Sequence, residues 1–253
     1  MQYTKSSRRI LVVLPAYNEE ENIGDLLDQI RFALEVDSKN EYKVYVVNDG
    51  CIDQTEAIVK QKSLEMPIEL IIHEVNQGLG ATIRDGLYKA VNDSNPNDVI
   101  ITMDADATHN PGLILRLMRM IIEGHDVVIA SRFQPGARVI GLAWYRKLLS
   151  IAASYIFRVL FPIRGVKDYT CGYRAIRADV LKQAMAEYGD RFFDQDGFQA
   201  LVDILLKLRK RKLLFGETPL ILRYDQKGGM SKMNVSRTIK KTLILIVKRF
   251  FVK

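Results

Sequence analysis

Residues 10–34 of the chain read ILVVLPAYNEEENIGDLLDQIRFAL. The run from Ile10 to Leu14 is short, apolar and rich in β-branched side chains, which favours a buried strand. Apolar residues then recur at helical spacing, at Ile23, Leu26, Leu27, Ile30 and Leu34. Asn18 is the expected cap of that helix. A strand followed by a helix is the repeating unit of α/β folds.

The same alternation of strand and helix continues to about residue 130. Further strands are predicted at Tyr42–Val47, Ile68–Ile72, Asp98–Met103 and Val127–Ala130. Helices are predicted to begin near Thr55, Gly78 and Leu113. This order predicts a doubly wound, mostly parallel sheet of the Rossmann-like kind, which binds ligands at the carboxyl ends of its strands.

Composition narrows the class of protein. The chain has 253 residues, of which 48% are hydrophobic, enough for a large core and too apolar for a disordered chain. Its two cysteines, Cys51 and Cys171, cannot form a disulfide framework and lack C-x-x-C spacing. A reducing compartment is therefore expected.

Positive charge is concentrated in two segments. The net charge is +7, yet residues 127–167 carry seven basic and no acidic residues, and residues 226–253 carry eight basic and no acidic residues. Aromatic residues there adjoin Leu and Ile rather than forming a base-stacking pattern, so we expect an anionic membrane surface as partner and no nucleic acid.

The apolar stretches within these segments are too short to span a bilayer, which takes about 18 residues or more. Leu148–Phe157 and Leu243–Val247 are instead predicted to form amphipathic helices in the membrane interface. For the first stretch, an ordinary helix packed on the core remains the alternative.

Two common phosphate-binding motifs are absent from the sequence. Gly78 and Gly80 fit G-x-G, but Ile83 stands where a dinucleotide site needs its third glycine, and no P-loop occurs. Acids instead follow the predicted strands, at Glu19, Glu20, Asp49, Asp53, Asp104 and Asp106. Oxygen-only ligands indicate Mg²⁺ or Mn²⁺ shared with a diphosphate. Solvated loop acids are the alternative.

A set of motifs in order along the chain makes the sequence recognisable. They are Leu14-Pro-Ala-Tyr-Asn-Glu-Glu, Val47-Asn-Asp-Gly-Cys-Ile-Asp, Asn76-Gln-Gly-Leu-Gly-Ala, Met103-Asp-Ala-Asp, Ser131-Arg-Phe, Asp168-Tyr-Thr-Cys-Gly-Tyr-Arg and Gly229-Met-Ser-Lys. The chain resembles the family-2 glycosyltransferases with a GT-A fold, and among them the dolichol-phosphate mannosyltransferase and polyprenyl-phosphate sugar transferase branch. The resemblance runs from about Ile10 to Lys232.

The resemblance implies a nucleotide sugar donor, GDP-mannose or a UDP-hexose. The donor would contact Pro15, Ala16, Tyr17, Glu19, Asp49 and Asp104, and a Mg²⁺ or Mn²⁺ ion would bind Asp104 and Asp106. Among the donor and metal positions, the chain departs from the family pattern in two places. Asn48 replaces the usual first aspartate of the base-reading pair, and Thr108 stands where a glutamine often joins the metal ligands.

The resemblance also implies a dolichyl or polyprenyl phosphate acceptor. Its phosphate would contact Arg132, Lys167, Arg174, Lys227, Ser231 and Lys232. Lys227 stands near the position where the family usually has an arginine. An arginine can contact a phosphate through two N–H groups at once, whereas the lysine ammonium group acts as a point charge. Asp106 and Arg132 are the expected catalytic residues, and Asp203 is a candidate base. The catalytic domain is expected to span residues 1–235, with residues 236–253 as a basic amphipathic helix that anchors it to the membrane surface.

The acceptor decides whether a base is needed. A phosphate monoester, with its second pKa near 6, is mostly a dianion at neutral pH, whereas a sugar hydroxyl needs a nearby carboxylate. We therefore predict metal-dependent, inverting transfer of a hexose, mannose by the resemblance, to polyprenyl phosphate. The protein would be peripheral, on the cytoplasmic face of the membrane, and compatible with a membrane-embedded protein partner.

Three other functions stay open at this point. One is a family-2 transferase that acts on a saccharide hydroxyl, with Asp203 or another acid as base. Another is a nucleotidyltransferase on a similar sheet, although Pro15-Ala-Tyr-Asn-Glu lacks its usual glycine-rich basic loop. The third is a non-catalytic basic module, which would leave the acids after the strands unexplained.

Overall fold

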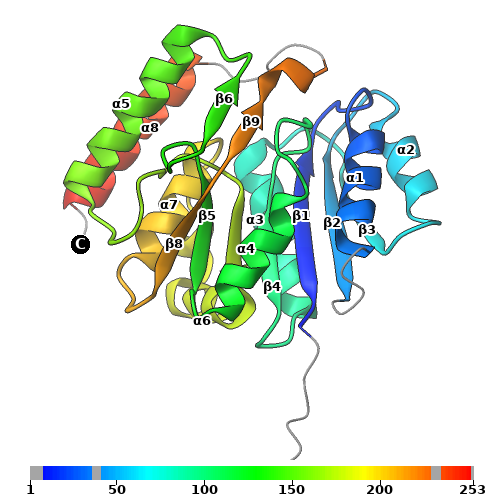
Figure 1. Cartoon of the computed structure of the whole chain (residues 1–253), viewed down its shortest axis with the longest axis horizontal. Helices are drawn as coiled ribbons and strands as arrows, with labels where there is room; N and C mark the ends of the chain where they lie inside the picture. The colour runs from blue at the N-terminus through cyan, green and yellow to red at the C-terminus, as the bar shows by residue number, and fades with distance from the viewer. Residues whose placement is uncertain (1–7, 36–40, 229–234, 252–253) are drawn as a thin grey trace, which may run out of the picture.

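The computed structural model describes residues 8–35, 41–228 and 235–251. Its main sheet has seven strands in the order β3-β2-β1-β4-β7-β5-β8 (Figure 1). In chain order they are β1 Ile10–Ala16, β2 Tyr42–Asp49, β3 Ile68–His73, β4 Val99–Thr102, β5 Val127–Ser131, β7 Arg174–Arg177 and β8 Phe215–Pro219. All neighbours are parallel except β7, which is antiparallel to both β4 and β5. The predicted mostly parallel α/β sheet is confirmed.

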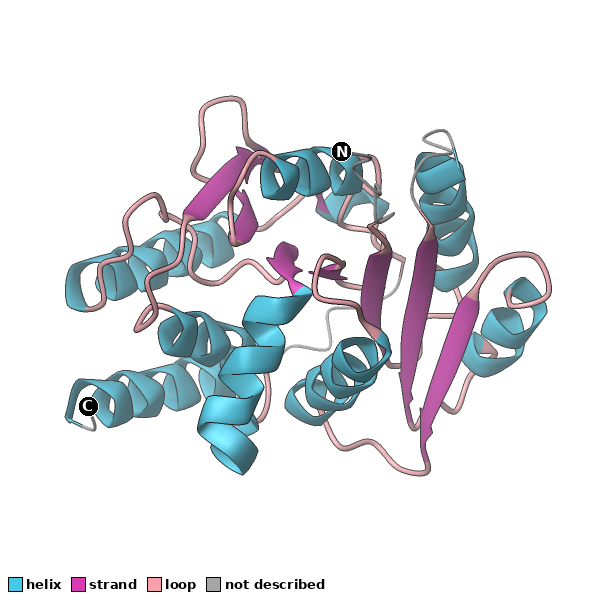
Figure 2. Ribbon diagram, turned by 90° about the horizontal axis from the view of Figure 1, so that it is seen from below, coloured by secondary structure: helices cyan, strands magenta, loops and turns pink. Residues whose placement is uncertain are grey.

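Helices cover both faces of this sheet (Figure 2). They are α1 Ile23–Glu35, α2 Thr55–Lys62, α3 Leu79–Asp93, α4 Leu113–Ile122, α5 Trp144–Leu160, α6 Ala178–Tyr188, α7 Gln199–Leu208 and α8 Val235–Phe251, with short 3₁₀ turns η1 Gly189–Phe193 and η2 Tyr224–Gln226. A second small sheet pairs β6 Arg138–Ile140 with β9 Ile221–Arg223 in parallel. The helices predicted to begin near Thr55, Gly78 and Leu113 are present.

The central strands are buried on both faces, as expected of a parallel sheet covered by helices. In β1, residues from Ile10 to Leu14 are at most 1% exposed, and all four residues of β4 are buried. Helix α1 buries Ile23, Leu26, Leu27, Ile30 and Leu34, which confirms the helical spacing read from the sequence.

The entry to α1 differs from the expected cap. Helix α1 begins at Ile23, and the Glu19 carbonyl accepts hydrogen bonds from the Asn22 and Ile23 N–H groups. Asn18 instead adopts φ 52°, and its side-chain oxygen accepts a hydrogen bond from the Ile52 N–H at 2.9 Å. The cap prediction was wrong because Asn18 is one of the few residue types that enter the left-handed region readily, and here it ties the loop after β1 to the loop after β2.

Helices α5 and α8 lie at one side of the molecule, beyond the small β6–β9 sheet (Figure 1). Each leaves a row of large apolar side chains exposed. On α8 they are Ile239, Leu243, Ile244, Val247, Phe250 and Phe251. Within the described residues, no helix combines the length and the apolar character needed to cross a bilayer.

The packing of α3 on the sheet generates a stability prediction. A Cβ atom on Gly86 would lie 2.5 Å from Val13 Cγ1 and 3.0 Å from Val47 Cγ2, both buried side chains of the central strands. We expect Gly86→Ala to lower the free energy of unfolding by about 1–3 kcal/mol, the usual cost of overpacking. Urea denaturation measures it.

The matched control is Gly24→Ala in α1, where the new Cβ would meet only Ile58 Cγ2 at 3.4 Å. That variant should be neutral or more stable by up to about 1 kcal/mol, because alanine favours the helix. Equal stabilities of Gly86→Ala and wild type would contradict the close packing of α3 on β1.

Candidate active site

The acids predicted from the sequence converge at one edge of the sheet. Because β2, β1 and β4 are parallel neighbours, their carboxyl ends lie together. Ala16 at the end of β1 is opposite Asn48 of β2, and Val13 is opposite Thr102 at the end of β4. The loops that carry Glu19, Asp49, Asp104 and Asp106 therefore leave the sheet at the same edge.

Asp106 is held on both carboxylate oxygens. Its Oδ1 accepts a hydrogen bond from the Thr108 hydroxyl at 2.7 Å and a longer one from the Thr108 N–H at 3.2 Å. Its Oδ2 lies 2.5 Å from Nζ of Lys227. Burial would raise the pKa of Asp106, but Lys227 and the Thr108 hydrogen bond outweigh it, and the pKa is lowered. Asp106 is therefore a carboxylate at neutral pH.

Asp104 is half-buried two residues before Asp106. Loss of water raises its pKa, and His109 opposes that rise while the negative charges of Asp106 and Glu19 add to it. Space beside this carboxylate is kept by Gly172, where a Cβ atom would lie 3.4 Å from Asp104 Oδ1. A positive charge next to the two acids would relieve their mutual repulsion.

The buried ring of His109 lies next to Asp104. The Asp104 N–H donates a hydrogen bond to Nδ1 of His109 at 3.1 Å, so in a neutral ring the proton is on Nε2, which lies 3.9 Å from Asp104 Oδ2. The ring is buried and stacks on Tyr173, with centroids 5.0 Å apart. His109 therefore orients the acid, a role that residue spacing alone did not reveal.

Pro15, Ala16, Tyr17 and Glu19 form the end of β1 and the loop after it. Glu19 is buried, and its Oε2 accepts a hydrogen bond from Nδ2 of Asn22 at 2.8 Å. Asn22 also holds Gly228, whose N–H donates to Asn22 Oδ1 at 3.0 Å. Asn22 could not be predicted from the sequence, because its partner Gly228 is 206 residues away in the chain.

Asp49 is buried and bonded to the segment that starts α3. Its Oδ1 accepts from the Gln77 N–H and lies 2.7 Å from Nδ1 of His73, and its Oδ2 accepts from the Gly78 N–H. Nε2 of His73 reaches Asp85 at 3.0 Å. Asp49 thus shapes the loop beside the candidate donor site, in addition to any contact with a nucleotide base.

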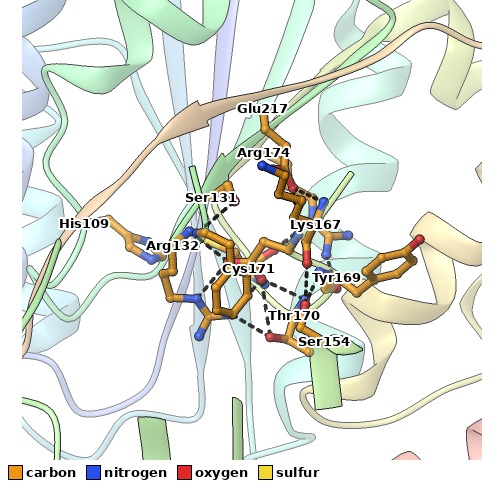
Figure 3. A network of polar contacts seen from close by, with 12 residues as sticks. His109, Ser131, Arg132, Ser154, Lys167, Tyr169, Thr170, Cys171, Arg174 and Glu217 are labelled. Carbon is orange, nitrogen blue, oxygen red and sulfur yellow. Dashed lines mark hydrogen bonds and ion pairs between the residues drawn. The ribbon is translucent and has the colours of Figure 1, made fainter. Parts of the chain in front are cut away.

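Arg132 is paired with a fully buried acid (Figure 3). Its Nε and Nη2 atoms lie 2.8 and 2.7 Å from the two carboxylate oxygens of Asp168, and Nη2 also lies 2.5 Å from Thr170 Oγ1. Burial opposes the charged form of Arg132, but the Asp168 charge outweighs it and raises the pKa of the guanidinium. Arg132 is therefore a fixed, charge-compensated group rather than a free phosphate clamp.

Arg174 lies inside the core, contrary to its predicted role at an acceptor phosphate. Its guanidinium donates hydrogen bonds to the carbonyls of Cys171, Leu201 and Tyr169, and the residue is 1% exposed. Burial lowers the pKa of Arg174 to about 10, so it stays charged at neutral pH. Arg174 thus links β7 to α7 through these hydrogen bonds. Because its side chain is buried, a ligand cannot reach it in this structure.

Lys167 is exposed next to this network, and its backbone N–H donates to Glu217 Oε1 at 2.6 Å (Figure 3).

The two cysteines lie in loops near the strand ends. Burial raises the pKa of Cys171 to about 12, so it is an inert thiol at neutral pH. The predicted phosphate ligands Ser231 and Lys232 fall outside the described residues.

Asp203 is locked in an ion-pair network between α7 and α8. It is 1% exposed, lies 2.6 Å from Nζ of Lys207, and accepts hydrogen bonds from Nε and Nη2 of Arg249 at 2.5 and 2.8 Å. Asp194 extends the network to Lys248 at 2.6 Å. Helix α8 is therefore fastened to the catalytic domain through its basic residues, and Asp203 is not exposed to an acceptor.

Tyr224 was not predicted from the sequence, and it lies near both the acid pair and Arg132. Burial raises the pKa of its hydroxyl, and the charges that act on it are Asp104, Asp106, Lys227 and Arg132. It begins η2, the turn that carries Lys227 to Asp106. The candidate site therefore comprises the acid pair after β4, the loop after β1, and the segment 224–228 that lies across them.

Comparison with known proteins identifies the family of the chain. The model for glycosyl transferase family 2 matches residues 11–184. The chain is 31% identical over 207 residues to a dolichol-phosphate mannosyltransferase of Pyrococcus furiosus, covering 81% of this chain and 54% of that protein. The chain thus spans about half the length of that relative.

Two further relatives match over more of their own length. A polyprenol monophosphomannose synthase of Mycolicibacterium smegmatis is 30% identical over 92% of this chain and 83% of its own. An undecaprenyl-phosphate mannosyltransferase of Micrococcus luteus is 30% identical over 89% of this chain and 88% of its own.

Solved structures share the fold. A glucosyl-3-phosphoglycerate synthase from Mycobacterium tuberculosis, crystallised with Mn²⁺, UDP and phosphoglyceric acid, superposes with a TM-score of 0.68 at 18% identity, covering 98% of this chain and 81% of that one. Its likeness supports the GT-A architecture predicted from the sequence. With the family model matched over most of the strand-helix units that carry the acids, the chain belongs to glycosyl transferase family 2, and the protein is a glycosyltransferase.

Proposed function

We propose that this glycosyltransferase moves mannose, with inversion, from a nucleotide sugar to a polyprenyl or dolichyl phosphate, with a divalent cation, at the cytoplasmic face of a membrane. Relatives that share about 30% identity over most of the chain carry names of polyprenyl-phosphate mannose transfer, which supports the acceptor and the sugar. GDP-mannose is the donor of first choice, and a UDP-hexose is the alternative.

The main structural support for a phosphate acceptor is that the side chain of Asp203 is buried and ion-paired. A sugar hydroxyl needs a carboxylate within hydrogen-bond reach, whereas a phosphate dianion does not. Asp203, the candidate base, is buried and committed to Lys207 and Arg249. With its base candidate enclosed, the chain is better suited to an acceptor that arrives already ionised.

The acid pair fits a divalent cation shared with a diphosphate. Within the described ranges, no cluster of three or more His, Cys, Asp or Glu side chains could hold a metal by itself. Mg²⁺ needs no such cluster, because it usually binds one or two carboxylates and completes its shell with substrate phosphates and water. Asp104 and Asp106 supply two carboxylates, and Gly172 leaves space beside Asp104. The residues present therefore suit the ion.

The chemistry follows from charge. A bound cation would neutralise the negative charge that develops on the departing nucleoside diphosphate. Asp104 and Asp106 would hold that cation, and Lys227, which contacts Asp106, would help to neutralise the diphosphate. The loop after β1, from Pro15 to Glu19, would line the nucleoside. Arg132, held in a fixed orientation by Asp168, would contact the acceptor phosphate as one partner of a compensated ion pair.

Membrane association is proposed for the side of the molecule formed by α5 and α8 (Figure 1). Trp144, Tyr145, Leu148 and Tyr155 on α5 are exposed, as are Leu243, Val247 and Phe250 on α8. Basic residues adjoin both rows, at Lys147 and Arg158 on α5 and at Lys240 on α8. Apolar side chains bordered by Lys and Arg are typical of helices that lie in an anionic interface.

The metal assignment is tested on Asp106. Asp106→Asn should reduce kcat/KM by at least about a hundredfold, since electrostatic stabilisation of the leaving group is lost. Its Mn²⁺-dependent binding of GDP-mannose, measured by calorimetry, should fall below detection. The control Asp190→Asn changes an exposed acid outside the site and should behave as wild type. Near-normal turnover of Asp106→Asn would contradict the assignment.

The acceptor class is tested on Asp203. Removing a partner from a buried ion pair costs about 3–5 kcal/mol, so Asp203→Asn should lower the melting temperature markedly. At a temperature where the variant is folded, its kcat with polyprenyl phosphate and the pH profile of kcat should match those of wild type. Loss of turnover with an unchanged melting temperature would instead identify Asp203 as a base and favour a hydroxyl acceptor.

The membrane surface is tested by replacing exposed apolar residues of α8. The double variant Leu243→Gln with Phe250→Gln should bind anionic liposomes at least about tenfold more weakly, because buried apolar area drives interfacial binding. The matched control replaces Ile52 and Leu64, which are 90% and 87% exposed and lie on the segments around α2. Equal losses in co-sedimentation for the two double variants would argue against α8 as the contact surface.

A further inference from the structure

Lys227 and Asp106 form an ion pair that is largely withdrawn from water. Nζ and Oδ2 are 2.5 Å apart, and each side chain is only 14% exposed. A carboxylate buried without a positive partner is costly, so this lysine contributes directly to keeping Asp106 ionised. The other oxygen, Oδ1, is taken by Thr108. A metal ion that bound Asp106 through Oδ2 would compete with the ammonium group for that oxygen.

The charged groups around Asp106 would be neutralised better by a divalent cation than by the single charge of lysine. The charges that act on Asp104 are His109, Asp106, Lys227 and Glu19. Three of the groups gathered here are carboxylates, and Lys227 supplies a single permanent positive charge. The cluster thus keeps an excess of negative charge with the lysine in place, which favours replacement of a monovalent group by a divalent ion.

Lys227 belongs to a segment, residues 224–228, that joins two loops of the site. At its start, the Arg223 N–H donates to the Thr108 carbonyl at 3.0 Å, which fixes it to the loop that carries Asp106. At its end, the Gly228 N–H donates to Asn22 Oδ1 at 3.0 Å, which fixes it to the loop after β1. The segment therefore crosses the carboxyl ends of β4 and β1 as a strap.

The far end of the strap fits closely. A Cβ atom on Gly228 would lie 2.5 Å from Glu21 Oε2 and 3.0 Å from Asn22 Oδ1, so a larger residue there would require these side chains to shift. Asn22 in turn holds Glu19. Movement of Lys227 away from Asp106 would thus be transmitted to the loop that lines the proposed nucleoside site.

We propose that Lys227 is an internal stand-in cation: it occupies the place of the divalent ion on Asp106, holds the 224–228 strap closed, and is displaced when the ion arrives. This inference rests on the proposed metal-dependent function. Displacement leaves the ammonium group beside the incoming diphosphate and frees the strap from one of its anchors. Lys227 in this way couples metal binding to rearrangement of the strap. The coupling is reciprocal, so opening of the strap raises the affinity for the metal by the same factor by which the metal favours opening.

The direct test is the affinity for Mn²⁺ alone, measured on the full chain by electron paramagnetic resonance of the free ion. Lys227→Met removes the competing charge and keeps a similar length, so it should bind Mn²⁺ about tenfold more tightly than wild type, within the usual range of coupling between sites. Lys227→Arg keeps the charge and should remain close to wild type. The control Lys182→Met removes an exposed charge on α6 and should change nothing.

A second readout follows the strap itself. The Gly228 amide, protected by Asn22, should exchange its hydrogen faster in wild type with saturating Mn²⁺ than without it, and should already exchange fast in Lys227→Met. Unchanged or weaker Mn²⁺ binding by Lys227→Met, or an unchanged exchange rate, overturns the proposal. If Asp106→Asn binds Mn²⁺ as wild type does, the proposed metal site fails instead, so the two failures are distinguishable.

Discussion

Repulsion between carboxylates at the carboxyl edge of the sheet is the constraint on which the site depends. Asp104 and Asp106 leave β4 two residues apart, and Glu19 approaches from the loop after β1. The parallel sheet forces these loops together, because the ends of neighbouring strands share one edge. Positive charge must be supplied there, and in this structure Lys227 supplies it to Asp106. In the proposed reaction a divalent ion would meet the same need.

Other charges in the molecule serve rigidity. Arg132 with Asp168, and Asp203 with Lys207 and Arg249, are compensated inside the protein. The first pair holds the Arg132 guanidinium at a constant orientation. The second fastens α8 to α7, so the apolar row of α8 keeps a fixed position relative to the active site. Preorganised charges of this kind need no rearrangement during catalysis.

Much of the fold could be predicted from the sequence. The strands that begin at Ile10, Tyr42 and Ile68 and the helices between them follow local patterns of apolar residues, which a single strand or helix displays by itself. Strand β7 could not be predicted in this way. It comes from residues 174–177 yet inserts antiparallel between β4 and β5, a choice made by distant partners.

The site was predictable in part for the same reason. Acids directly after strands had to share an edge, whatever the details of packing. Basic residues were harder, because their partners are remote in the chain. Lys227 is 121 residues from Asp106, and Arg174 is as basic as any ligand but its guanidinium ends on backbone carbonyls in the core. The residue types showed which side chains are charged. Only the three-dimensional structure shows which of those charged side chains already bond to partners within the protein.

The most direct measurement is sugar transfer by the full chain in vesicles that contain a short polyprenyl phosphate and labelled GDP-mannose. We expect a mannosyl phospholipid whose anomeric configuration, read by NMR, is opposite to that of the donor. We also expect that EDTA stops its formation and that Mn²⁺ or Mg²⁺ restores it. Transfer to a saccharide hydroxyl in place of the lipid, or undiminished transfer in EDTA, would contradict the proposed function.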